Sequence, residues 1–267
     1  MRSINLNKLT LATLVLSLGI LACEKEKEII APWDTAGPDG RTAHLRIVHA
    51  SPNLATIAGA TTDLVNVFAN GTKVNGVRLA YAGLFPAQTP TTYAAVPAGA
   101  VDLKISIGGA ANTTNFDSIP ITTLRVNMDA GKYYSLVITD SILNGSKDSA
   151  KIFVNDVFTT PNTGAYGLRV INAMKDTGAN QRVDIWSARR NNTLYTNIQT
   201  GTIGAFANLA FINIPDTLIV RRAGTTTELA RINTITFANT KVYTLILRGE
   251  VNVTGTKAKT LTWFSNR

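Results

Sequence analysis

The feature that most constrains the fold of this chain is an internal repeat. The stretch LRIVHASPN at 45–53 returns as LRVINAMKD at 168–176. Further matches follow in the same order: DLVNVFANG from 63 with RVDIWSARR from 182, TYAAVPAG from 92 with AFINIPDT from 210, GKYYSLVITD from 131 with TKVYTLILRG from 240, and KIFV from 151 with KTLTWF from 259. Collinear matches about 110–120 residues apart indicate a duplicated domain rather than a solenoid of short repeats.

The repeat divides the 267 residues into segments. We expect a signal peptide at 1–22, a tether at 23–41, a first domain at 42–160, a linker at 161–164 and a second domain at 165–267. Each domain is long enough to bury its own core. Because the linker is short, the two domains should touch.

Within each repeat the apolar residues alternate with polar ones, as in Val65, Val67 and Ala69 against Asn66 and Phe68. Segments of this kind recur between turn sequences such as ANGTK and VPAGA. This spacing predicts an all-β protein, with seven to eight short strands in each domain arranged as a β-sandwich.

The N-terminus predicts export and a lipid anchor. Arg2 and Lys8 precede the apolar run Leu9–Ala22, which is too short to span a bilayer but suits a secretory signal. Ala22 and Cys23 resemble the end of a bacterial lipobox, with Cys23 as the lipidated residue; an ordinary signal peptide with a chance cysteine is the alternative. A single cysteine cannot form an internal disulfide.

The segment after Cys23 reads EKEKE and then IIAPWDTAGPDG, which is typical of a solvated tether. Its acidic residues resemble the surface-export signals of Bacteroidota lipoproteins, although a plain spacer explains them equally well. We therefore expect a protein anchored in the outer membrane that faces the periplasm or the cell surface.

Four stretches, LRIVHASPN, VNVFANG, VPAG and AGKYYSLVITD, together resemble the bacterial family of domains of unknown function 4397. The first domain matches along its length, whereas the second keeps LRVINA, VDIW and VYTLIL. The resemblance implies two tandem immunoglobulin-like or transthyretin-like sandwiches outside the cytoplasm, and it implies no catalytic residues. Asp129, Gly131 and Tyr133 also resemble a tyrosine corner, which ANTKVY in the second domain lacks.

His49 and Ser51 could act as a base and a nucleophile, because alternate residues of a strand share a face. A triad also needs an orienting acid and oxyanion donors, and there is no G-x-S-x-G elbow. The repeat keeps this strand but carries Asn172 and Met174 at these positions. We therefore predict a structural role for both residues and no enzyme activity, with a hydrolase as a remote alternative.

Metal sites are weakly supported by the sequence. Asp140, Asn144 and Asp148 surround one loop, but their spacing is not that of an EF-hand and Lys147 opposes a cation. Two histidines and one cysteine do not make a zinc site. We expect no metal and no cofactor.

Charge is concentrated in the second domain. Residues 165–267 carry 13 Lys and Arg against 5 Asp and Glu, a balance of +8, whereas residues 42–160 carry 8 against 7, a balance of +1. Most of this excess is arginine, at positions 169, 182, 189, 190, 221, 222, 231 and 248. Guanidinium groups suit carboxylate, sulfate or phosphate, so an acidic glycan, lipopolysaccharide or extracellular DNA could bind, although a scattered basic surface is the alternative.

In RVDIWSARR, Asp184 and Trp186 should share the outer face of their strand if Val183 and Ile185 point into the core. An exposed aromatic ring beside a polar side chain can hold a sugar; the alternative is that this face is covered. We take Asp184, Trp186, Arg189, Arg190, Arg221 and Arg222 as candidate ligand-binding residues. The predicted function is a non-catalytic binding module of the cell envelope without specific nucleic-acid recognition, and the alternative is a structural subunit with a protein partner.

Overall fold

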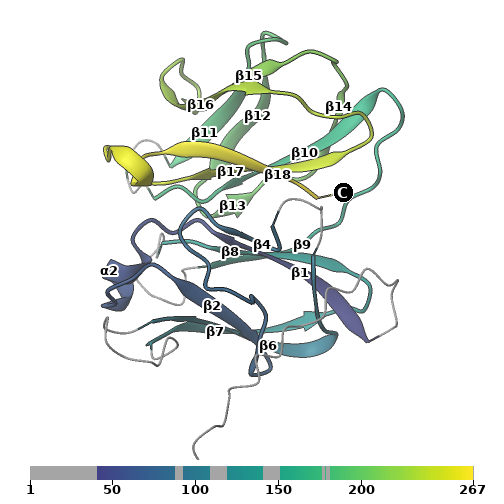
Figure 1. The fold of residues 1–267 in the computed structure, drawn as a ribbon. Coiled ribbons are helices and arrows are strands. Elements are labelled where there is room, and N and C mark those ends of the chain that lie inside the picture. Colours follow the sequence, from purple (N-terminus) through teal and green to yellow (C-terminus); the bar gives the residue numbers. More distant parts are fainter. Residues whose placement is uncertain are drawn as a thin grey trace, which may run out of the picture.

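The computed structural model describes residues 41–87, 93–108, 119–140, 151–175, 178 and 181–266. The regular structure of these residues is almost entirely β, and their strands form four sheets stacked as four layers (Figure 1). The predicted signal peptide, the predicted lipidation site Cys23 and the predicted tether up to residue 40 lie outside the described residues. In the described ranges, no helix is both long and apolar enough to cross a membrane.

Strands from the first half of the chain form two of these sheets. One sheet has the order β4-β1-β8-β9, with β5 also paired to β1, and the other has the order β3-β2-β6-β7. The strands are β1 (Thr42–His49), β2 (Val65–Ala69), β3 (Thr72–Lys73), β4 (Leu84–Phe85), β5 (Ala94–Pro97), β6 (Gly99–Ile107), β7 (Ile119–Met128), β8 (Tyr133–Ile138) and β9 (Lys151–Asn155). A short helix, α2 (Leu54–Ala58), lies between β1 and β2.

Strands from the second half repeat this topology. One sheet has the order β13-β10-β17-β18, with β14 paired to β10, and the other has the order β12-β11-β15-β16. The strands are β10 (Ala165–Asn172), β11 (Arg182–Ser187), β12 (Asn192–Gln199), β13 (Thr202–Ile203), β14 (Ala207–Ala210), β15 (Asp216–Arg222), β16 (Glu228–Ile235), β17 (Val242–Arg248) and β18 (Thr260–Ser265). A single 3-10 turn, η2 (Gly255–Lys257), precedes β18.

The first strand of each half runs parallel to a late strand of the same half. Leu45 is paired with Tyr134 across β1 and β8, and Leu168 with Tyr243 across β10 and β17. These registers agree with the repeats read from the sequence.

The pairing of the edge strands corrects one sequence match. Leu45 is paired with Ala94, and Leu168 with Ala207, so the counterpart of β5 is β14. The stretch that begins at Ala210 therefore does not correspond to β5, because the loop between β14 and β15 is longer than that between β5 and β6.

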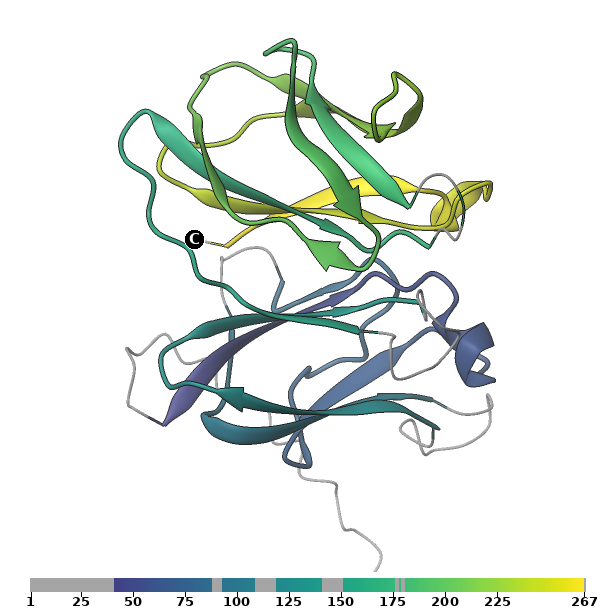
Figure 2. The ribbon, with the colours of Figure 1, turned by 180° about the vertical axis from the view of Figure 1, so that it is seen from behind.

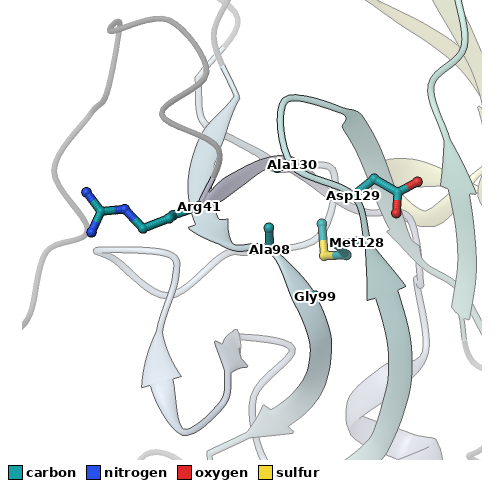
Figure 3. Close-up of a pocket in the computed structure, with 6 residues that line it drawn as sticks. All are labelled: Arg41, Ala98, Gly99, Met128, Asp129 and Ala130. Atoms are coloured by element: carbon teal, nitrogen blue, oxygen red, sulfur yellow. The ribbon is translucent and has the colours of Figure 1, made fainter.

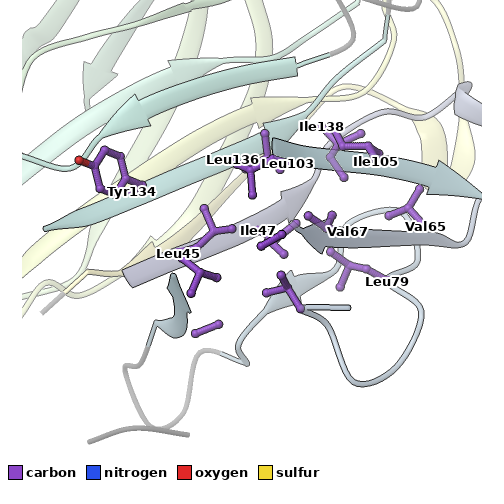
Figure 4. Close-up of a cluster of buried hydrophobic side chains, with 14 of the residues drawn as sticks. Leu45, Ile47, Val65, Val67, Leu79, Leu103, Ile105, Tyr134, Leu136 and Ile138 are labelled. Atoms are coloured by element: carbon purple, nitrogen blue, oxygen red, sulfur yellow. The ribbon is translucent and has the colours of Figure 1, made fainter. Parts of the chain in front are cut away.

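The central strands are buried on both faces. In β8, Tyr134, Leu136 and Ile138 point into the core of the first half (Figure 4), whereas Ser135 and Val137 are buried against the other half. Such strands read as nearly continuous apolar runs, whereas strands of the outer sheets, such as β11, show the half-buried alternation.

The two halves pack face to face through equivalent residues. Val48, Ala50 and Val137 of the first half form one apolar cluster with Ile171, Ala173 and Ile246 of the second, to which Phe264 is added. Val48 and Ile171 occupy matching positions in β1 and β10, as do Val137 and Ile246 in β8 and β17. The junction therefore has the self-complementary character of a twofold dimer interface, and Figure 2 shows the two inner sheets against each other from behind.

The tyrosine corner is formed by Tyr134, not by Tyr133 as predicted. The Tyr134 hydroxyl accepts a hydrogen bond from the Asp129 backbone N–H at 2.8 Å. Successive residues of a strand face opposite sides, so Tyr133 instead stacks on the His44 ring at 4.7 Å between centroids. Gly131 has a left-handed backbone (φ 71°) and donates its N–H to Thr42 O in this turn.

The second half also has this corner, although its sequence ANTKVY lacks the Asp-x-Gly-x-Tyr motif. The Tyr243 hydroxyl accepts a hydrogen bond from the Ala238 backbone N–H at 2.9 Å. The bond needs only a phenol and a backbone donor, so the absence of the Asp-x-Gly pattern does not prevent it.

Candidate functional site

His49 is a buried residue that joins the two sheets of the first half. Its Nε2 lies 2.8 Å from Asp63 O, and the Ser51 backbone N–H donates to Nδ1 at 3.4 Å. Burial lowers the pKa of His49 to about 4. The ring is therefore neutral at pH 7, and both of its nitrogens are engaged by backbone groups.

Asn172 makes the same two kinds of contact at the matching position of the second half. Its Nδ2 donates to Ile198 O at 3.1 Å, and its Oδ1 accepts from the Met174 N–H at 3.3 Å. An amide thus replaces an imidazole with the same donor and acceptor pattern. The shared contacts show that the side chain at this position fixes the course of the chain in both halves.

Asp140 is buried at the end of β8 and binds the turn after β1. Its carboxylate accepts from the Ser51 hydroxyl, from the Asn53 N–H at 3.1 Å and from Asn53 Nδ2 at 3.2 Å. Burial raises the pKa of Asp140 above its usual value, and these bonds oppose that shift.

Asn144 and Asp148, weighed above with Asp140 as a calcium site, lie outside the described residues. Across the described part of the chain, no group of three or more His, Cys, Asp or Glu is placed to hold a metal ion.

A connected polar cluster lies in the junction between the halves. Arg169 Nη2 lies 2.5 Å from Asp156 Oδ1, and Arg169 Nε donates to Thr244 Oγ1 at 2.9 Å. Asp156 Oδ2 also accepts from the hydroxyls of Tyr93 at 2.9 Å and Ser135 at 2.6 Å. All five residues are buried, so this ion pair is shielded from water.

Arg46 is the counterpart of Arg169 in the first half, and it is fully buried. Its Nη1 donates to Ser265 O at 2.5 Å, and its guanidinium carbon lies 4.3 Å from the Tyr93 ring centre and 4.9 Å from that of Phe264. Burial lowers the pKa of Arg46.

The backbone identifies Asn266 as the counterpart of Asp156. The Asp156 N–H donates to Tyr133 O and the Asn266 N–H to Val242 O, both at 2.7 Å. Arg169 therefore has the Asp156 carboxylate as its partner, whereas the matching position near Arg46 carries the neutral amide of Asn266. Sequence reasoning missed this cluster, although an arginine at the same place in two apolar strands was a signal.

The outer face of the β12-β11-β15-β16 sheet brings together part of the predicted binding residues. We name it the Trp186–Arg221 face, after Trp186, Ile219, Arg221, Glu228 and Arg231. Trp186 is opposite Ile219, which in turn is opposite Arg231. The Arg221 guanidinium carbon lies 4.1 Å from the centre of the Trp186 ring, so a planar cation already covers this ring.

Asp184 lies beside this face, but its carboxylate is used within the fold. Oδ1 accepts from the Asn197 N–H at 2.7 Å, and Oδ2 accepts from the Gly224 N–H at 2.9 Å. The Arg231 guanidinium similarly binds the Glu228 carboxylate through Nε at 2.6 Å and through Nη2. The arrangement suits an anionic group at Arg221 better than a sugar ring held between Trp186 and Asp184.

The other predicted residues lie away from the Trp186–Arg221 face. Arg189 donates from its N–H to Asp216 Oδ1 at 2.9 Å and from Nε to Pro215 O at 3.4 Å, beyond the end of β11. Arg190 donates to Ala210 O at the same end. Arg222 is opposite Val183, on the side of the sheet that faces the core. The six residues therefore do not form one patch.

Two arginines of the basic half serve the junction instead of a surface. Arg169 is buried there, and the Arg248 guanidinium carbon lies 4.9 Å from the ring centre of Tyr81 in the first half. The net charge of the second half therefore overstates its exposed positive charge.

Two hollows lie near the tyrosine corners. The one in the first half has a volume of about 490 Å³ and is lined by Arg41, Ala98, Gly99, Met128, Asp129 and Ala130. Figure 3 shows the charged groups of Arg41 and Asp129 pointing away from each other. The one in the second half has a volume of about 10 Å³. Its lining combines polar and apolar side chains, those of Tyr166, Arg189, Arg190, Asp216, Ile212, Ile214, Ile235 and Phe237. A hollow of this volume holds at most about one water molecule, so it is too small for a ligand.

Comparison with known proteins gives a family. No protein with a curated description matches the chain. Among solved structures, it is similar to the Bacillus anthracis TIE protein, with 12% identity, a TM-score of 0.22 and coverage of 79% of this chain and 34% of that one. It is also similar to a leucine-rich repeat protein from Bacteroides thetaiotaomicron, with 12% identity, a TM-score of 0.17 and coverage of 79% and 26%. TM-scores of this size give no basis for transferring fold or function. The family described as "Domain of unknown function (DUF4397)" matches residues 43–186, more than half of the 267 residues, and the chain therefore belongs to the DUF4397 family.

Proposed function

We propose that the protein is a non-catalytic binding module of the bacterial cell envelope, anchored in the outer membrane by a lipid on Cys23. It binds an anionic polymer, such as an acidic or sulfated glycan, through the Trp186–Arg221 face. The observation that carries this proposal is the guanidinium of Arg221 stacked 4.1 Å above the Trp186 ring on an outward-facing sheet.

Stacking prepares Arg221 for an anion. The ring holds the guanidinium plane in one orientation, so less side-chain entropy is lost when a ligand binds. The N–H groups at the edge of the plane can then donate two parallel hydrogen bonds to a carboxylate, sulfate or phosphate.

The surrounding charges support the choice of ligand. Arg231 adds a second guanidinium on the neighbouring strand, and its partner Glu228 is exposed and already bound to it. A ligand that repeats its charge along a chain would contact both arginines. Because this surface is exposed to solvent, added salt should weaken binding strongly.

The test is binding of the mature protein to sulfated dextran, with neutral dextran as the ligand control. Arg221→Ala should weaken binding about 10- to 100-fold, since a charged hydrogen bond contributes roughly 1.5–3 kcal/mol. Arg221→Lys should restore only part of the affinity, because it keeps the charge but not the planar fork.

Matched variants locate the site. Lys241→Ala removes one positive charge from an exposed turn away from this face and should leave binding almost unchanged. If Arg189→Ala with Arg190→Ala abolished binding while Arg221→Ala did not, the ligand would bind at the end of β11 and the Trp186–Arg221 face would be excluded. Absence of binding to every anionic polymer would favour the alternative of a structural subunit with a protein partner.

A further inference from the structure

The outer sheet of the first half carries its own cluster of cations around an aromatic ring. Phe68 on β2 is opposite Lys73 on β3 and opposite Lys104 on β6. Lys104 Nζ lies 5.5 Å from the centre of the Phe68 ring. Lys73, Phe68 and Lys104 therefore form one row across three neighbouring strands, on the side away from the core.

A third cation lies beside this row on the same face. Thr123 is the β7 residue opposite Lys104, whereas Arg125 is opposite Asp102, and the charged groups of Arg125 and Asp102 are 3.7 Å apart. The side chain of Arg125 is 80% exposed, so water weakens the ion pair and an incoming anion can compete with Asp102. We name this surface the Phe68–Lys104 face, after Phe68, Lys73, Lys104 and Arg125.

Its place in the repeat matches that of the Trp186–Arg221 face. Phe68 and Lys104 are opposite each other between β2 and β6, as Trp186 and Ile219 are between β11 and β15. In both halves a cation from the neighbouring strand lies over the aromatic ring. The Phe68–Lys104 face should bind an anion more weakly, since lysine is a strongly hydrated point charge without the planar fork of arginine.

We propose that the Phe68–Lys104 face is a second, weaker site for the same class of anionic polymer, so that one molecule bridges two polymer strands. This inference rests on the proposed function of the Trp186–Arg221 face. The two faces belong to the two outermost sheets of the four-layer stack and point in opposite directions (Figure 1).

The thickness of the stack separates the two sites. Sheets pack about 10 Å apart, so four layers separate the outer faces by about 30 Å. A short oligomer cannot reach both faces at once, whereas two long strands can be held on either side. Long polymers then gain avidity and become crosslinked.

The experiment is calorimetric titration of the mature protein with a sulfated dextran oligosaccharide that is shorter than the distance between the two outer sheets. The wild type should bind two molecules, the second about tenfold more weakly because lysines replace arginine there. Lys73→Ala with Lys104→Ala should reduce the stoichiometry to one and leave the tighter site unchanged. Lys132→Ala with Lys241→Ala, which removes two charges from exposed turns, is the matched control and should keep two.

Light scattering with long sulfated dextran tests bridging. Wild type should form large complexes that dissolve again in excess polymer, and the double lysine variant should form none. A wild-type stoichiometry of one, lost in Arg221→Ala and unaffected by the lysine changes, would overturn the second site and leave the proposed function standing. Two sites that are both insensitive to Arg221→Ala would overturn the proposed function instead.

Discussion

Arg46 and Arg169 occupy the same position in the two halves, and their surroundings differ. Arg169 forms a buried ion pair with Asp156, whereas the carboxylate that the repeat would supply to Arg46 is replaced by Asn266. Arg46 is held by a backbone carbonyl and two aromatic rings. The difference shows that one buried carboxylate is enough to organise a junction built around two arginines, provided that neutral groups complete the network.

Among the changes that test this difference between the halves, removal of the Asp156 carboxylate should have the largest effect on stability. Asp156→Ala should lower the free energy of unfolding by about 3–5 kcal/mol, because Arg169 would stay buried without its counter-ion. Urea denaturation measures this loss. Asp129→Ala, at an exposed turn, should change stability by less than about 0.5 kcal/mol. A similar, small loss in both variants would contradict the assigned role of Asp156.

Acid should destabilise the first half through His49, which has no titratable counterpart at the matching position of the second half, Asn172. The pKa of His49 is lowered to about 4 in the folded protein from an ordinary value of 6.5, so the unfolded chain takes up the proton first. Stability is therefore fully present above pH 6.5 and falls by about 3 kcal/mol by pH 4. Urea denaturation across this range measures the decline.

His49→Asn copies the second half and should reduce that decline while keeping the native contacts. Asp140 provides a background of opposite sign, since its raised pKa favours the folded state at low pH; comparing the variant with wild type removes this contribution. Equal acid sensitivity of both proteins would show that another group controls it.

Giving Arg46 a carboxylate partner, as Arg169 has, should change the stability less than the loss of Asp156 does. Asn266→Asp would place a carboxylate near Arg46, as Asp156 is near Arg169. We expect a gain of at most about 1 kcal/mol, because burying the new charge offsets most of the attraction. Thermal unfolding would measure it, and a large loss of stability would indicate that the amide donor to Tyr93, at 2.8 Å, matters more than the charge.

The smallest effect is expected on the outer sheets. Arg221→Ala should cost about 0.5–1 kcal/mol, as an exposed cation–π contact does. Lys104→Ala, over Phe68, should cost less because of its longer distance of 5.5 Å. Chemical denaturation of the two variants side by side tests this order, which would be refuted if Lys104→Ala cost more.

The sequence predicted the all-β fold and the order of the repeats, because apolar periodicity and turn residues are local signals. It did not predict which of the two neighbouring tyrosines forms the corner. Both residues are aromatic, and the side of the sheet toward which each one points is set by the strand register. It also did not predict the Arg169–Asp156 pair, which depends on how the two inner sheets lie against each other.

The candidate site was also predicted only in part, because contacts between strands are not a local signal. Alternation placed Trp186 on the outer face correctly, and the structure brings only Arg221 of the four candidate arginines to its ring. Arg189 and Arg190 are close to Trp186 in sequence but lie past the end of the strand, because the chain turns after Ser187. Proximity across strands cannot be read from spacing along one strand.

The double burial of the inner sheets also bears on how the molecule comes apart. Amide hydrogens of β1, β8, β10 and β17 are shielded from water by apolar layers above and below, so hydrogen exchange there should require opening of the entire stack. Cleavage of the connector between β9 and β10 should likewise leave the two halves associated through their inner sheets. We therefore expect the duplicated chain to unfold as one cooperative unit.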